Sequence, residues 1–108
     1  MEDIRIIAID FDGCLVEDKY PDIGDINAEV FEAAFTEQAA GSKLILWTCR
    51  AGRYLDAAVE FCASHELRFN AVNDHLPEMV AKYGGDAVKV YAAEYWDDRA
   101  VRMPRVKI

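Results

Sequence analysis

Short apolar segments and amphipathic segments alternate along the chain. The apolar segments are rich in β-branched residues and predict strands over residues 4–9, 43–47, 68–72, 88–91 and 94–96. Between them, apolar residues recur every three or four positions and predict helices that end at Gly41, Ser64 and Gly84-Gly85. These helices begin after Asp25 or Asn27, near Arg53 and after Asp74. Residues 106–108 favour a short additional edge strand.

The alternation of strands and helices is typical of a parallel sheet that is covered by helices on both faces. We therefore expect an α/β fold of three layers with a Rossmann-like parallel sheet, and a single domain over residues 1–108. Because crossovers between parallel strands are right-handed, the carboxyl ends of the strands lie along one edge of the sheet. Residues that directly follow the strands should meet at that edge.

The composition excludes several classes of function. The 108 residues are 53% hydrophobic and 30% charged and include three prolines, which argues against disorder. Lys and Arg total 12 against 20 for Asp and Glu, and the net charge of −8 disfavours binding to nucleic acid or to anionic membranes. No apolar run approaches the roughly 18 residues of a membrane span. The three cysteines match no zinc-binding spacing, and we expect reduced thiols in a cytoplasmic protein.

Acidic residues gather where the predicted strands end. Asp10 and Asp12 follow the first strand, and Asp97 and Asp98 follow the last. Thr48 follows the second strand. Carboxylate oxygens are ligands that Mg²⁺ prefers, so the convergence of these residues predicts a magnesium site at the carboxyl edge of the sheet.

Four ordered motifs carry a resemblance to a known family. They are IIAIDFDGCLV with Asp10 and Asp12, LILWTCR with Thr48, Lys89, and YWDDRA with Asp97 and Asp98. This ordered set resembles the haloacid dehalogenase superfamily of phosphotransferases, and in detail its small members that lack a cap domain. The resemblance implies a haloacid dehalogenase-like core without a separate cap and a phosphatase activity.

The resemblance also implies a role for each motif residue. Asp10 would attack phosphorus to form an aspartyl-phosphate, and Asp12 would act as general acid and then as general base. Mg²⁺ would be held by Asp10, the backbone carbonyl of Asp12, Asp97 and Asp98. Thr48 and Lys89 would bind the phosphoryl group. Gly13 would let the chain turn sharply after Asp12.

Several assignments have competing interpretations. Lys82 competes with Lys89 for the phosphate site, and Thr48 is also suited to cap the following helix. Asp98 is also suited to pair with Arg99 or Arg102. Arg50 is suited either to contact the substrate phosphate or to pair with a carboxylate.

Other functions are compatible with parts of the pattern. A thiol phosphatase needs an arginine six residues after its cysteine, and the only such pair, Cys62 and Arg68, lacks a glycine-rich loop. A signalling receiver domain needs an aspartate at the end of the third strand, where this chain has Phe69-Asn70. The alternative function is an inactive or weakly active haloacid dehalogenase-like or receiver-like module that binds Mg²⁺ and phosphate in a regulatory or scaffold role.

The sequence leaves the partners broadly defined. The expected partner is a phosphorylated substrate of unknown identity, and nucleic acid would bind only as a phosphorylated end. Residues 99–108 carry four basic side chains and no acid, and they are candidates for a contact in a homo-oligomer.

Overall fold

The computed structural model describes residues 4–105, and the edge strand predicted over residues 106–108 lies outside the described residues. The strands are β1 (Ile6–Ile9), β2 (Lys43–Leu46), β3 (Ala71–Val72) and β4 (Glu94–Trp96). The helices are α1 (Ala28–Ala39), α2 (Gly52–Ser64) and α3 (Pro77–Tyr83). None of the helices in the described part of the chain has the length and apolar character needed to cross a membrane.

The four strands form a parallel sheet in the order β3-β2-β1-β4. β1 is therefore central: Ile9 is paired with Leu46 of β2 on one side and with Trp96 of β4 on the other. This register brings the carboxyl ends of β1, β2 and β4 to the same level. The predicted convergence of Asp10, Thr48 and Asp97 follows from it, because Asp10 and Asp97 directly follow β1 and β4 and Thr48 is the second residue after β2.

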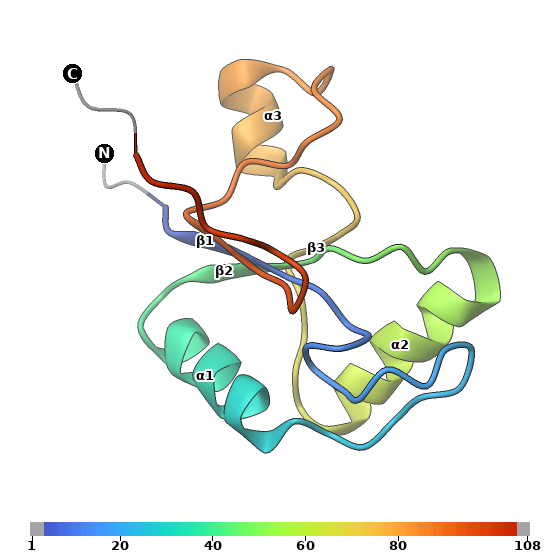
Figure 1. Ribbon diagram of the computed structural model, residues 1–108. Helices are drawn as coiled ribbons and strands as arrows, with labels where there is room; N and C mark the ends of the chain where they lie inside the picture. Colours follow the sequence, from blue (N-terminus) through green and yellow to red (C-terminus); the bar gives the residue numbers. More distant parts are fainter. Residues whose placement is uncertain (1–3, 106–108) are drawn as a thin grey trace.

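Alternate residues of β1 belong to two separate cores, one on each face of the sheet. Ile7 and Ile9 lie in the larger core with residues of α1 and α2, whereas Ile6 and Ala8 lie in a smaller core that includes Val90. Figure 1 shows α1 and α2 below the sheet and α3 above it. The three-layer, Rossmann-like α/β fold predicted from the sequence is confirmed. Because β1 is covered on both faces, it needs the continuous apolar sequence that it has.

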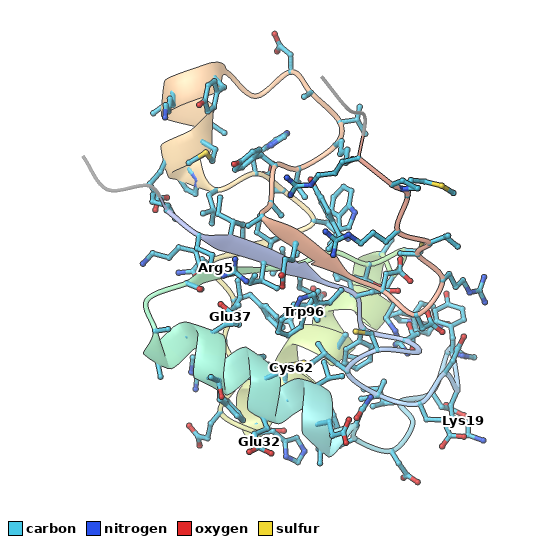
Figure 2. All side chains as sticks on the ribbon, turned by 60° about the vertical axis from the view of Figure 1, so that its left-hand side comes forward. Arg5, Lys19, Glu32, Glu37, Cys62 and Trp96 are labelled. Atoms are coloured by element: carbon cyan, nitrogen blue, oxygen red, sulfur yellow. The ribbon has the colours of Figure 1, made fainter. Side chains whose placement is uncertain are left out.

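The larger core reaches the last strand as well. Trp96 of β4 is partly buried against the cluster that contains Cys62 of α2, and Figure 2 shows both side chains on the same side of the sheet. At the opposite end of the sheet, Arg5 before β1 pairs with Glu37 of α1 at 3.0 Å (Figure 2). This pair is exposed and contributes little to stability, so the apolar contacts determine how the helices are placed.

Two predicted strands differ from the structure. Residues 88–91 form no strand but an irregular segment in which Val88 is 89% exposed and Val90 is 1% exposed. Val90 is buried in the smaller core. Its carbonyl accepts a hydrogen bond from the Tyr95 hydroxyl rather than from the backbone of a neighbouring strand. β3 is shorter than predicted because the Asn70 side chain accepts a hydrogen bond from the Leu44 N–H at 2.9 Å, where a backbone ladder would otherwise continue.

Candidate functional site

A pocket of about 470 Å³ lies at the carboxyl edge of the sheet. The loops that follow β1, β2 and β4 contribute its walls. Its lining residues are Asp10, Asp12, Asp18, Tyr20, Thr48, Cys49, Arg50, Asp97, Asp98 and Arg99. The structure therefore brings five of the six predicted site residues to one pocket and leaves Lys89 outside it.

Asp10, Asp97 and Asp98 form a compact acidic trio within this pocket. One carboxylate oxygen from each lies within 4.8 Å of the others. The Asp10 N–H donates to the Trp96 carbonyl at 2.9 Å, so β1 and β4 stay paired up to the trio itself. Asp97 Oδ1 also accepts the Arg99 N–H at 2.9 Å. The donor set consists entirely of hard oxygen atoms, and it fits Mg²⁺ in ligand type.

Burial and neighbouring charge make Asp10 unusual among these acids. Its pKa is raised from 3.8 to about 6, first by desolvation and then by the nearby Asp97, Asp12 and Asp98 carboxylates. A hydrogen bond from the Phe11 N–H to Asp10 Oδ1, at 2.8 Å, acts in the opposite direction and favours the ionised form. In the protein without metal, ionisation of Asp10 beside these carboxylates therefore lowers stability.

This cost predicts a pH dependence of stability for the metal-free protein. Because the folded-state pKa of Asp10 is raised, its destabilising effect is absent below pH 4, grows between pH 4 and 6 and is complete above pH 6. Asp10→Asn removes it. In EDTA, the melting temperature of Asp10→Asn relative to the wild type should thus rise between pH 4 and 6 and then level off. A difference that stays constant from pH 4 to 7.5 would contradict the shifted pKa.

Gly13 allows the loop after β1 to pass very close to Asp98. Its φ is +82°, and a Cβ atom placed on it would lie 2.5 Å from Asp98 Oδ2 and 2.8 Å from Asp98 Cγ. The predicted sharp turn at Gly13 is confirmed. The structure adds a second requirement, because even a residue that tolerates positive φ would displace a member of the acidic trio.

Gly13→Ala should therefore damage the site more than the fold. If the trio binds Mg²⁺, the alanine variant should lose metal affinity at least tenfold, since Asp98 must move. It should also lose about 1–2 kcal/mol of stability from the left-handed backbone. Titration calorimetry with Mg²⁺ and thermal unfolding measure the two effects. Gly41→Ala is the matched control, because Gly41 also has positive φ, at +97°, but has no atom within 4 Å of the added carbon. Equal metal affinity in the two variants would exclude the proposed close approach.

Asp12 makes contacts that differ from those of the trio. Its two carboxylate oxygens are bound by Arg50, with Oδ2 accepting from Nε at 2.7 Å and Oδ1 from Nη2 at 2.8 Å. The Arg50 side chain is 1% exposed and that of Asp12 is 16% exposed. Hydrogen bonding to Asp12 raises the pKa of Arg50 above its ordinary value. Of the two interpretations of Arg50 from the sequence, the structure shows the pairing with a carboxylate.

Arg50 also holds the loop that closes one side of the pocket. Its guanidinium donates to the carbonyls of Pro21 and Asp22, at 3.3 and 2.8 Å, and to that of Tyr54 at 3.3 Å. The same group lies 5.0 Å from the ring centroid of Phe11. A buried guanidinium with this many acceptors has its donors satisfied, so Arg50 connects the loops after β1 and β2 as a fixed unit.

Thr48 is held in the pocket by its own loop and by Asn73. The Thr48 hydroxyl oxygen accepts the Arg50 N–H at 3.2 Å, which leaves the hydroxyl hydrogen available to a ligand. Asn73 follows β3 with φ of +49°, and its side-chain oxygen accepts the Thr48 N–H at 2.8 Å. Its amide group donates to the Arg50 carbonyl at 3.3 Å. Thr48 does not cap α2: Ala51 occupies the N-cap position, without a side-chain hydrogen bond.

Lys89 lies apart from the acidic pocket, contrary to its predicted role at the phosphate. It lines a different hollow beside α3, together with His75 and Met79, and its ammonium group lies 5.0 Å from the ring centroid of Tyr95. The bend at residues 88–89 directs the chain to the α3 face of the sheet. Lys82, the competing candidate, lies in α3, where its ammonium group is 5.0 Å from the Tyr83 ring centroid.

The cysteines of the larger core are chemically inert. Burial raises the pKa values of Cys14 and Cys62 to about 12, and the Cys14 thiol donates to the Trp96 carbonyl at 3.5 Å. Burial and the raised pKa disfavour the thiolate form near neutral pH, so both thiols are poorly suited to act as nucleophiles. Cys49 is exposed and lines the pocket.

The sequence pattern did not indicate the hydrogen bonds from Arg50 to the loop after β1, the contacts of Asn73 or the presence of Tyr20 at the pocket. One signal was available for Asn73: an asparagine directly after a strand is among the few residues that adopt positive φ at low cost. No local signal marks Tyr20, because its position depends on the guanidinium beneath it.

The sequence matches no family model and no curated protein. Among solved structures, it is similar to a conserved protein from Bacteroides thetaiotaomicron. The two are 38% identical, and the alignment covers 95% of this chain and 84% of that chain with a TM-score of 0.81. The two proteins are therefore similar in sequence as well as in fold over nearly the full length of this chain.

Proposed function

We infer that this chain, which belongs to the same family as the conserved Bacteroides thetaiotaomicron protein, is a Mg²⁺-dependent phosphatase that hydrolyses phosphate monoesters. The observation that carries the proposal is the acidic trio of Asp10, Asp97 and Asp98 in one pocket with Thr48. The resemblance of the four sequence motifs to the haloacid dehalogenase superfamily supports the same reaction.

In the proposed reaction, a carboxylate oxygen of Asp10 attacks phosphorus, and the bond between phosphorus and the leaving oxygen breaks. Asp12 donates a proton to that oxygen. A water molecule then attacks the aspartyl-phosphate and gives a proton to Asp12, which releases inorganic phosphate and restores Asp10. When bound to the trio, Mg²⁺ would offset the negative charge of the carboxylates and of the phosphoryl group.

Thr48 and Arg99 are the residues that we propose to contact the phosphoryl oxygens. The free hydroxyl hydrogen of Thr48 can donate to one of them. Arg99 lines the pocket and carries a positive charge there, whereas the guanidinium of Arg50 is occupied by Asp12. This assignment gives Arg99 the electrostatic role that the sequence pattern had suggested for Lys89.

A direct test is phosphate release by the purified protein with 4-nitrophenyl phosphate, with and without Mg²⁺. We expect turnover that depends on Mg²⁺ and a covalent phosphoenzyme that survives acid quenching and is cleaved by hydroxylamine, as an acyl phosphate is. Turnover without a phosphoenzyme in rapid-quench samples would argue for direct attack by water. No turnover with any phosphate monoester in a broad panel would refute the proposed activity.

One observation favours a second candidate function. Both oxygens of Asp12 are held by Arg50, so the proposed proton donor is engaged in this structure. A module that binds Mg²⁺ and phosphate without turnover, in a regulatory or scaffold role, needs no proton donor. That candidate predicts binding of inorganic phosphate in the presence of Mg²⁺ with no release of phosphate from esters.

Asp97→Asn should weaken metal binding with little effect on the other functions of the site. Loss of one charged ligand should raise the Mg²⁺ concentration for half-maximal activity at least tenfold, with a smaller effect on the rate at saturating metal. The measurement is a Mg²⁺ titration of phosphatase activity. Asp56→Asn makes the same change of charge on the exposed side of α2 and should leave the titration unaltered. An unchanged metal requirement in Asp97→Asn would place the ion elsewhere.

A further inference from the structure

The acidic pocket is larger than a phosphoryl group requires. Its volume of about 470 Å³ lies in the range of sites that enclose a small organic molecule. Tyr20 lines the same pocket as the trio and Thr48. If the phosphoryl group of a substrate is bound at the trio, a leaving group that extends along this pocket can meet the Tyr20 ring.

Tyr20 is exposed but held in place. The residue is 55% exposed. Its N–H donates to Asp18 Oδ1 at 3.3 Å, and its ring meets the Tyr54 ring edge-on with 5.7 Å between centroids. The Arg50 guanidinium lies 5.1 Å from the Tyr20 ring centroid. An exposed aromatic side chain with this much support binds a ligand at low entropic cost, because little motion remains to be lost.

The guanidinium beneath the ring also changes which ligands suit it. The face of an aromatic ring carries partial negative charge, which opposes face-to-face contact with a second π-system. The Arg50 cation on one side of Tyr20 draws electron density toward itself. The opposite face is therefore less negative and better suited to stack with an electron-rich planar ring than to bind the C–H groups of a sugar.

Charge limits the size of such a ligand. The net charge of −8 disfavours long polyanions. A small phosphate monoester brings only its own phosphate charge, which meets the metal-binding end of the pocket, and its planar group is uncharged. A monomeric ligand fits these constraints, whereas a nucleic acid strand does not.

We propose that Tyr20 is a stacking platform that selects phosphate monoesters whose leaving group carries a planar aromatic ring, such as the nucleoside of a mononucleotide, with its base stacked on Tyr20. The proposal rests on the phosphatase function inferred above. It assigns the specificity of the reaction to the loop after β1 and not to a cap domain.

The test compares two substrates that share the reacting bond. Adenosine 5′-monophosphate and ribose 5-phosphate are both esters of a primary hydroxyl group, and they differ in the presence of the base. With Mg²⁺, the wild type should show kcat/KM about tenfold or more higher for the nucleotide, as expected for one base stacked on an aromatic side chain. Tyr20→Ala should bring this ratio close to one, and Tyr20→Phe should keep it.

Tyr83→Ala is the matched control. Tyr83 is 70% exposed and lies at the end of α3, outside the acidic pocket, so its removal should leave the ratio unchanged. A wild-type ratio near one, or a ratio that Tyr20→Ala does not lower, overturns the proposal. Thermal unfolding of Tyr20→Ala shows whether the loop around Arg50 is intact, and Tyr20→Phe keeps the comparison valid if it is not.

Failure of the phosphatase function gives a different result. In that case neither compound is hydrolysed, and calorimetry with each compound and Mg²⁺ measures binding instead. A dissociation constant about tenfold lower for the nucleotide, lost in Tyr20→Ala, supports the platform in a binding module. Equal dissociation constants overturn it.

Discussion

Asp10→Asn is expected to reduce Mg²⁺-dependent phosphate release by a factor of about 1,000 or more. The amide is similar in size to the carboxylate but lacks its negative charge and is a poor nucleophile. The aspartyl-phosphate should disappear with the activity, because both depend on the same oxygen atom. The measurement is single-turnover phosphate release together with acid-quench detection of the phosphoenzyme.

The structure makes this variant informative because the fold should tolerate it. Asp10 contributes a backbone N–H to the pairing of β1 with β4, and the substitution leaves that hydrogen bond in place. Its raised pKa indicates that the ionised side chain destabilises the metal-free protein, so Asp10→Asn should unfold at the same temperature or higher at pH 7. Asp56→Asn controls for the loss of one charge. Activity within tenfold of the wild type would refute Asp10 as the nucleophile.

Arg50→Met is expected to destabilise the fold by about 3 kcal/mol, the lower part of the range for breaking a buried ion pair. Methionine keeps much of the aliphatic volume but leaves the Asp12 carboxylate, 16% exposed, without its partner. Three backbone carbonyls lose a donor at the same time. For a domain of this size the melting temperature should fall by roughly 10–20 °C.

A double-mutant cycle isolates the ion pair from the other contacts of Arg50. Adding Asp12→Asn to Arg50→Met removes the unpaired charge and should recover part of the lost stability. Arg53→Met is the matched control, since Arg53 is exposed and stacks on Tyr54 and has no carboxylate partner among residues 4–105. If Arg50→Met and Arg53→Met melt at similar temperatures, Arg50 does not connect the two loops.

The site residues whose positions were predicted correctly lie just after the ends of buried strands. Asp10, Thr48 and Asp97 each follow an apolar segment directly, and parallel topology then brings them together without further information. The sharp turn at Gly13 was predicted, because a left-handed turn after a strand favours glycine. Each of these predictions depends only on nearby sequence, and the parallel sheet then brings the predicted residues together in space.

The position of Lys89 could not be predicted from local sequence in this way. Residues 88–91 have the alternation of a short strand, but four residues give little information, and Val90 reaches the core from a bent segment as well as from a strand. The direction of the Lys89 side chain then depends on the turn between α3 and β4, which no pattern specifies. Tyr95, six residues later, provides the aromatic face beside which its ammonium group lies.

Arg50 illustrates a second limit. The sequence places it close to Thr48, but its choice between substrate and carboxylate is made by partners 28 to 38 residues away. Burial decides the outcome: a guanidinium that is 1% exposed needs an acceptor for nearly every donor, and the Asp12 carboxylate and two loop carbonyls provide most of them.

The central position of β1 has a consequence for how the protein is made. The trio combines residue 10 with residues 97 and 98, so Asp10 leaves the ribosome well before the other two members. One edge of the apolar β1 strand stays unpaired until β4 has been synthesised. If the trio binds Mg²⁺ as proposed, metal binding during synthesis is a late event, and ribosome-bound chains that stop before residue 94 should fail to retain the ion even when their first two strands are formed.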